Sequence, residues 1–123
     1  MPRTQLLIID DHENVRAALR ARLDAAPDIY VVGCTGGWRM GLSMALSFEP
    51  DVVLLETKRD DGYGLEALSC LTAQCPMTKV IVLTSYADLD ERSEAVSRGA
   101  AGYLLKDIDT GQLVREIRLI EQT

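Results

Sequence analysis

Several residue types are scarce in this sequence of 123 residues, which contains one histidine, one tryptophan and one phenylalanine. Its three cysteines form an odd set without a C-x-x-C spacing: Cys34, Cys70 and Cys75. Such a set is typical of small buried thiols in a reducing compartment. A zinc site needs several thiolate or imidazole ligands, and His12 is the only imidazole. We therefore expect free thiols and no zinc.

Long apolar runs and clusters of positive charge are also lacking. No apolar run approaches the roughly 20 residues that a membrane-spanning helix needs, and the N-terminus has none of the regions of a signal peptide. Lys and Arg number 13 against 19 Asp and Glu, a net charge of −6. Because binding to nucleic acids depends on clustered cations, we expect a cytoplasmic domain that directly contacts neither membranes nor nucleic acid.

Five short apolar runs alternate with amphipathic segments. The runs are rich in Val, Ile and Leu with little polar alternation, which is typical of parallel strands buried on both faces. They are LLIID (6–10), IYVVGC (29–34), DVVLLE (51–56), KVIVLT (79–84) and GYLLK (102–106). Helical patterns follow each run, at about 13–26, 38–48, 64–73, 88–98 and from 109 onward. The alternation predicts one flavodoxin-like (βα)5 domain over residues 1–123, a doubly wound parallel α/β sheet with strand order 2-1-3-4-5.

Polar side chains end four of the five runs. In a sheet of this order, ligands bind beyond the carboxyl ends of the strands, at the topological switch point between strands 1 and 3. The residues at these ends are Asp10, Glu56, Thr84 and Lys106, and Asp11 follows Asp10. Each alone has a simpler explanation, as a helix cap, a structural hydroxyl or a solvated lysine. Together they predict a phosphoryl site, because carboxylates hold Mg²⁺, one carboxylate can act as a nucleophile, and a hydroxyl and an ammonium can receive the transferred charge.

These residues carry a resemblance to a known family. With the stretches LLIIDDHENVRAALRARL, PDVVLLE, KVIVLTSY and RGAAGYLLKD, the chain resembles a bacterial response-regulator receiver domain of the NarL/FixJ type over nearly its whole length. The resemblance implies an Mg²⁺ site at Asp10 and Asp11, a switch hydroxyl at Thr84 and a phosphoryl-contacting lysine at Lys106. Tyr103 falls on the aromatic residue that turns inward on activation, although a half-buried strand aromatic is the simpler interpretation.

The resemblance also implies partners. A receiver of this type receives its signal from a sensor histidine kinase. It precedes a helix-turn-helix output domain, so residues 1–123 would be the N-terminal part of a longer transcription regulator. A homodimer is a further expectation from the family. The receiver itself is expected to be a signalling domain rather than an enzyme.

The chain departs from the family at the phosphoacceptor. The family's third strand ends on an aspartate, and Glu56 occupies that position here. The extra methylene moves the carboxylate out by about 1.5 Å, and in-line attack on a phosphoryl group tolerates little displacement. The next loop differs too, because Arg59 and Asp60 stand where the family usually has Met-Pro, and Tyr63 precedes Gly64 where it has Asp-Gly.

Three interpretations of Glu56 follow. It could imitate the phosphorylated state and keep the domain constitutively active, although its charge of −1 is smaller than that of a phosphate. Alternatively the domain is a pseudo-receiver controlled by partner or ligand binding, with a weak or lost Mg²⁺ site at Asp10, Asp11 and Glu56. Glu56 could also be an engineered phosphomimetic, which would leave the altered loop unexplained. The loop favours the pseudo-receiver.

The state of the switch can be predicted from the geometry of one carboxylate. A single carboxylate cannot readily bond two groups that are placed around a three-oxygen phosphoryl group. We therefore expect an ion pair between Glu56 and Lys106, no hydrogen bond between Glu56 and Thr84, and an outward-facing Tyr103.

The stretch GCTGGWRMG (33–41) keeps a different class of function open. A flavodoxin-like sheet could belong to a nucleotide-binding enzyme with this stretch as its phosphate loop, but it fits neither G-x-G-x-x-G nor a Walker pattern. The helix predicted after it is unusually apolar, with Trp38, Met40, Met44 and Leu46 in addition to its inward face. These residues fit either extra core packing or a partner surface.

Overall fold

All five predicted strands join one parallel sheet in the computed structural model, which describes residues 2–123. The strands are β1 (Thr4–Ile9), β2 (Ile29–Thr35), β3 (Val52–Leu55), β4 (Lys79–Thr84) and β5 (Gly102–Leu105). Their order is β2-β1-β3-β4-β5 and every neighbouring pair is parallel. The predicted fold class and strand order are therefore confirmed.

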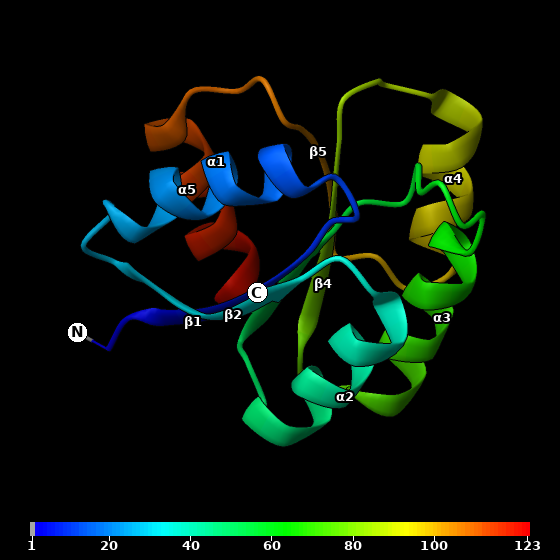
Figure 1. The fold of residues 1–123 in the computed structure, drawn as a ribbon, viewed down its shortest axis with the longest axis horizontal. Helices are drawn as coiled ribbons and strands as arrows, with labels where there is room; N and C mark the ends of the chain where they lie inside the picture. Colours follow the sequence, from blue (N-terminus) through cyan, green and yellow to red (C-terminus); the bar gives the residue numbers. More distant parts are fainter. Residues whose placement is uncertain (1) are drawn as a thin grey trace.

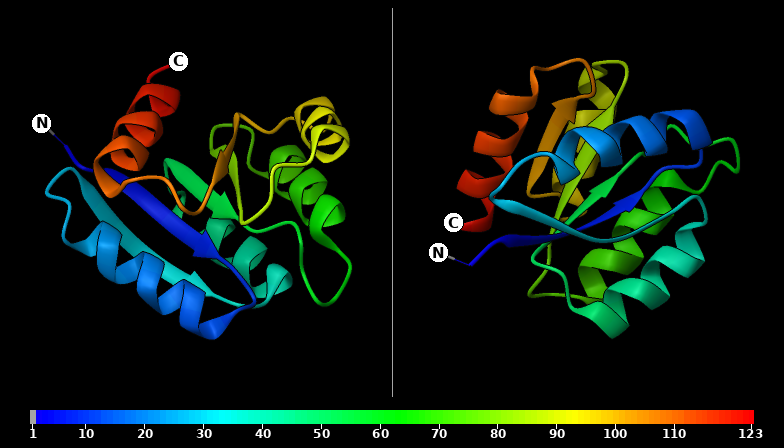
Figure 2. Two further views of the ribbon diagram at one scale, coloured as in Figure 1. Left: turned by 90° about the horizontal axis from the view of Figure 1, so that it is seen from above. Right: turned by 60° about the vertical axis from the view of Figure 1, so that its left-hand side comes forward.

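Helices cover both faces of this sheet, as Figures 1 and 2 show. On one face lie α1 (Glu13–Asp24) and α5 (Thr110–Glu121). The other face is covered by α2 (Trp38–Phe48), α3 (Gly64–Gln74) and α4 (Leu89–Ser97). No helix among residues 2–123 is both long and apolar enough to cross a membrane.

The central strands explain the continuous apolar runs of the sequence. Along β1, Leu6 and Ile8 pack in the core beneath α1 and α5, whereas Leu7 and Ile9 pack in the core on the opposite face. Residues 52–55 of β3 are buried in the same alternating way, at 1% exposure or less. Because both faces of these strands are covered, polar residues can appear only where the strands end.

Local interactions set three ends of two helices, α4 and α5. Asp88 caps α4 by accepting hydrogen bonds from the backbone N–H groups of Asp90 and Glu91, and Asp109 accepts one from Gln112 at the start of α5. Gly99 has a φ of +100° just after α4, a left-handed conformation in which glycine commonly ends a helix.

Helical spacing predicts that Val15, Phe48 and Val96 face the core with the other apolar residues of α1, α2 and α4, but all three are exposed. Val15 is 38% exposed, Phe48 46% and Val96 57%. Phe48 lies over Gly33 of the edge strand β2, so part of its ring extends past the sheet into solvent. Val15 lies at the carboxyl end of the sheet and lines a surface hollow beside Lys106.

Candidate functional site

The four predicted strand-end residues meet at one end of the sheet. Asp10 directly follows β1, Glu56 follows β3, Thr84 ends β4 and Lys106 follows β5. Asp10, Glu56 and Thr84 are buried, with exposures of 2%, 4% and 0%. Two backbone hydrogen bonds hold the strand ends in register, from Glu56 N–H to the Ile9 carbonyl (3.0 Å) and from Lys106 N–H to the Thr84 carbonyl (2.8 Å).

The ammonium group of Lys106 lies between two buried carboxylates. Its Nζ donates to Asp10 Oδ2 and lies 2.7 Å from Glu56 Oε1. Burial opposes the charged form of Lys106, but the hydrogen bonds to Asp10 and Glu56 prevail and raise its pKa above the usual lysine value. The predicted Glu56–Lys106 ion pair is confirmed.

The hydroxyl of Thr84 takes no part in this network. Glu56 uses its second oxygen, Oε2, to accept a hydrogen bond from Lys58 N–H at 3.0 Å. Thr84 Oγ1 is buried without any hydrogen-bond partner. The predicted absence of a Glu56–Thr84 hydrogen bond is therefore confirmed, and an unsatisfied hydroxyl remains beside the phosphoacceptor position.

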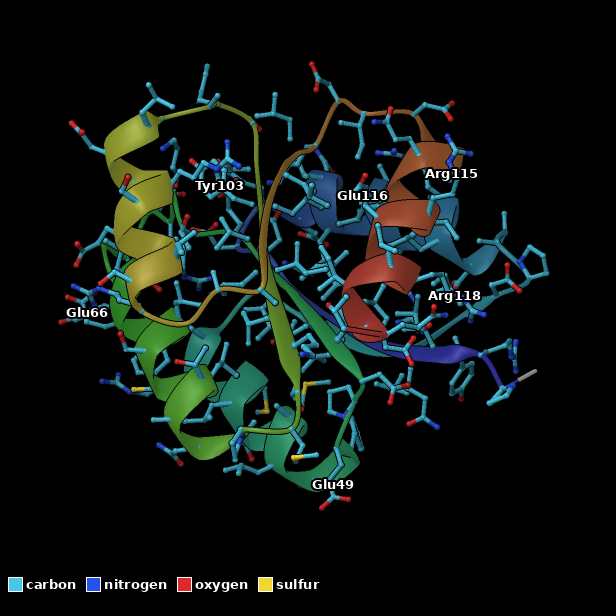
Figure 3. All side chains as sticks on the ribbon, turned by 180° about the vertical axis from the view of Figure 1, so that it is seen from behind. Glu49, Glu66, Tyr103, Arg115, Glu116 and Arg118 are labelled. Atoms are coloured by element: carbon cyan, nitrogen blue, oxygen red, sulfur yellow. The ribbon has the colours of Figure 1, made fainter. Side chains whose placement is uncertain are left out.

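The prediction that Tyr103 faces outward is wrong. Figure 3 shows Tyr103 on the side of β5 that faces α4, where the ring is half-buried against the core. Its hydroxyl donates to Glu91 Oε1 at 2.9 Å and lies 3.4 Å from the Tyr86 carbonyl oxygen. Burial and the Glu91 carboxylate raise the pKa of Tyr103 to about 12. The carboxylate acceptor of Glu91 on α4 holds the phenol inward, although the Thr84 hydroxyl forms no hydrogen bond.

Asp10, Asp11 and His12 present their ligand atoms close together. One atom from each lies within 4.8 Å of the others, and Asp11 Oδ1 is buried without a hydrogen-bond partner. The carboxylate oxygens of Asp10 and Asp11 suit a hard cation such as Mg²⁺, so these two residues fit the metal. Among residues 2–123 Glu56 does not belong to this group of close ligand atoms, and its oxygens contact Lys106 and the Lys58 N–H instead. Glu56 as a metal ligand stays a prediction.

The loop between β3 and α3 adds two cationic side chains, Lys58 and Arg59, and each is bonded to another part of the protein. Lys58 Nζ donates to Glu91 Oε2 at 2.9 Å, while Thr57 Oγ1 donates to the other oxygen of Glu91 at 2.9 Å. Arg59 is buried, with 1% of its side chain exposed, and its Nη2 donates to the Gly36 carbonyl at 2.5 Å. The charged sequence TKRDD predicts an exposed loop, so pattern reasoning missed both roles.

Two surface hollows show that size alone does not locate the site. The larger, of about 470 Å³, lies at the opposite end of the sheet between Pro50 and Pro76 and contains no cluster of buried charged groups. The smaller, of about 240 Å³, is lined by Glu56, Lys58 and Lys106, among others. The predicted site residues Glu56 and Lys106 therefore line the smaller hollow.

The order of strands and the acidic pocket define a signal-receiver fold. The family described as "Response regulator receiver domain" matches residues 6–118. The chain belongs to the response-regulator receiver family, with relatives of the NarL/LuxR type. Members of this family bind Mg²⁺ at the acidic site, and the Asp10–Asp11–His12 cluster lies at that position.

Individual relatives support this assignment. The chain is 37% identical over 93% of its length to the transcriptional regulatory protein LiaR of Bacillus subtilis, covering 54% of that protein. It is 33% identical over 91% of its length to the nitrate/nitrite response regulator NarL of Escherichia coli, covering 52%. The chain thus spans about half the length of the curated relatives it matches.

Solved structures show the same fold. The signal receiver domain of the response regulator NarL from Mycobacterium tuberculosis superposes with a TM-score of 0.91, at 22% identity, covering 99% of this chain and 98% of that one. The receiver domain of Thermotoga maritima CheB superposes with a TM-score of 0.88, at 24% identity, covering 98% of each chain.

Proposed function

We propose that this receiver is not phosphorylated in the usual way and is controlled by the binding of a partner or ligand. The main support is the state of the carboxylate at the phosphoacceptor position. Glu56 Oε1 is paired with Lys106 and Oε2 accepts the Lys58 N–H, so both candidate nucleophilic oxygens are engaged. Attack on a phosphoryl donor would have to break one of these contacts and overcome the displacement of the longer side chain.

Phosphotransfer from a small donor tests this proposal directly. We expect no added phosphoryl mass when the protein is incubated with acetyl phosphate and Mg²⁺. The matched variant Glu56→Asp restores the shorter acid and should gain a labile phosphoryl group. A phosphoryl group mapped to Glu56 itself would overturn the proposal.

A second candidate is a constitutively active receiver, and Tyr103 favours it. Its half-buried ring and its contacts with Glu91 and the Tyr86 carbonyl differ from the outward state expected of an inactive domain. Glu56→Ala separates the candidates in a regulator that carries its output domain. Loss of target-gene expression would support constitutive activity, whereas unchanged expression would support the pseudo-receiver.

Partners follow from the proposed function. The printed names of several relatives describe transcriptional regulators, which supports a helix-turn-helix output domain beyond residue 123 of a full-length regulator. A sensor histidine kinase, a homodimer and a cytoplasmic location are parts of the same proposal. The receiver has no basic stripe for nucleic acid, and we propose no enzymatic activity of its own.

A further inference from the structure

His12 is the member of the acidic cluster that magnesium does not explain. Mg²⁺ prefers oxygen ligands, whereas His12 adds an imidazole nitrogen to the carboxylates of Asp10 and Asp11. Its Nδ1 lies 3.4 Å from Asp10 Oδ1 and 3.3 Å from Asp11 Oδ1. Neighbouring ligand atoms around one divalent ion lie about 3.0 Å apart in octahedral and about 3.4 Å apart in tetrahedral coordination. The imidazole nitrogen therefore has the spacing from each oxygen that two ligands of one ion have.

The other oxygens of the two carboxylates are engaged elsewhere. Asp10 Oδ2 accepts a hydrogen bond from Lys106 Nζ, and Asp11 Oδ2 accepts one from the Asp60 N–H at 2.7 Å. Asp11 Oδ1 is buried and has no hydrogen-bond partner, although the imidazole lies beside it. These contacts hold both carboxylates so that one oxygen of each faces His12.

A simpler role for His12 would be to cap α1, since it occupies the N-cap position of that helix. Its side chain makes no capping hydrogen bond, however. The ring instead places its Nε2 3.8 Å from Asp60 Oδ2. A carboxylate near the far nitrogen is a usual partner of a metal-bound histidine, because it keeps the proton on that nitrogen and leaves the other nitrogen free to bind. The imidazole is therefore oriented as a ligand rather than as a helix cap.

One imidazole nitrogen beside two carboxylate oxygens changes which ions the cluster prefers. Imidazole suits first-row transition ions, whereas carboxylates and water suit Mg²⁺. A closed structural zinc site needs four protein ligands, and the cluster offers three. Three ligands leave coordination positions open to water or to an external ligand. The donor set therefore fits an open transition-metal site better than a purely hard-cation site.

We infer that Asp10, Asp11 and His12 form a site that selects divalent first-row transition ions over Mg²⁺, and that His12 determines this selectivity. Asp10 also contacts Lys106, which pairs with Glu56, so the ion would be connected to the phosphoacceptor position. The selectivity does not depend on the proposed function. Only its regulatory meaning, a metal ion as the ligand that controls the receiver, rests on that function.

Calorimetric titration of the protein without a polyhistidine tag tests the selectivity. We expect the wild type to bind Co²⁺ more tightly than Mg²⁺. His12→Gln removes the imidazole from an exposed position and should lower the ratio of the Mg²⁺ Kd to the Co²⁺ Kd by about tenfold or more, because loss of even an outer partner of a metal ligand costs about 10–100-fold in affinity. Glu13→Gln changes an adjacent exposed carboxylate outside the cluster. It is the matched control and should keep the wild-type ratio.

A second measurement observes the imidazole directly. Co²⁺ is paramagnetic and shifts the proton NMR signals of a bound imidazole far outside their usual range. His12 is the only histidine in the chain, so such signals can come from no other residue. We expect them in the Co²⁺-saturated wild type and not in His12→Gln.

Each other outcome would overturn the inference. An unchanged Kd ratio in a folded His12→Gln would show that the carboxylates alone set the preference. An equal gain of affinity for both ions in that variant would show that the imidazole repels cations. Absence of shifted imidazole signals, or of Co²⁺ binding, in the wild type decides against the site whether or not His12→Gln folds. Intact mass separates the two proposals, because added phosphoryl mass after acetyl phosphate would refute only the proposed function.

Discussion

At the scale of single residues, the candidate site is marked by unsatisfied atoms. Within residues 2–123, the buried side-chain atoms without a hydrogen-bond partner are Asp11 Oδ1, Arg59 Nη1 and Thr84 Oγ1. All three lie at the carboxyl end of the sheet or in the loop above it. The other buried side-chain nitrogen and oxygen atoms of the described residues have partners, as most do in folded proteins. The fold therefore concentrates its unfavourable polar burial where ligands would bind.

The hydroxyl of Thr84 should cost stability when no ligand is bound. Thr84→Val keeps the shape and removes the unsatisfied group, so we expect an increase of about 1 kcal/mol in the free energy of unfolding. Thr72 is the matched control, because its hydroxyl donates to the Arg98 carbonyl at 2.9 Å, and Thr72→Val should lower stability by a similar amount. Urea unfolding measures both. A destabilised Thr84→Val would show that the hydroxyl is satisfied in solution.

The phenol of Tyr103 should lose its proton at a higher pH than an ordinary tyrosine. Its pKa is raised to about 12 from 10.0, so the folded state keeps a proton that the unfolded state releases. This contribution to stability is complete below about pH 10 and is lost as the pH rises toward 12. Ultraviolet absorbance of tyrosinate measures it, with Tyr103→Phe to identify the signal. Ordinary titration of all four tyrosines would contradict the burial of this ring.

At the scale of elements, the sequence predicted the strands better than the loops. The runs of Val, Ile and Leu located every strand, because a strand buried on both faces can contain little else. The same logic located Asp10 and Glu56, since a carboxylate can follow such a strand only where the chain leaves the apolar core. Arg59 was missed because a charged loop suggests solvent, and burial of an arginine depends on tertiary contacts with Gly36 and Asp61.

The error over Tyr103 has a similar origin. Its orientation depends on Glu91, which lies on another element and whose role no local pattern indicates. Glu91 accepts hydrogen bonds from Thr57, Lys58 and Tyr103, so one carboxylate joins α4 to the β3–α3 loop and to β5. The position of α4 and the position of the aromatic ring are therefore coupled.

This coupling predicts the local stability of α4. Glu91→Ala removes the acceptor of all three hydrogen bonds, so the backbone amides of α4 should exchange hydrogen faster, whereas those of α3 should not change. Hydrogen exchange followed by mass spectrometry measures the difference. The control is Glu94→Ala, which removes only a pair with Arg98 on the same helix. Equal effects of the two substitutions would show that Glu91 does not tether the helix.

At the scale of the whole molecule, negative charge favours cation binding. The net charge is −6, and Asp11 Oδ1 accepts no hydrogen bond, although His12 Nδ1 lies 3.3 Å from it. A cation that binds only the folded state at ten times its Kd raises the free energy of unfolding by about 1.4 kcal/mol. We therefore expect Mg²⁺ to raise the melting temperature of the wild type and not of Asp11→Asn. An unmoved wild-type melting temperature would show that the pocket no longer holds the metal.

The pairing of Asp10 with Lys106 joins residues 96 positions apart in the chain. A ribosome releases Asp10 well before Lys106, because synthesis proceeds from the N-terminus. Until β5 docks on β4, the nascent chain cannot bury Asp10 and Glu56 against a positive charge, and burial without one would be strongly unfavourable. The acid pair therefore stays hydrated until β5 has been synthesised, and arrival of the lysine completes the pocket and the sheet in one step.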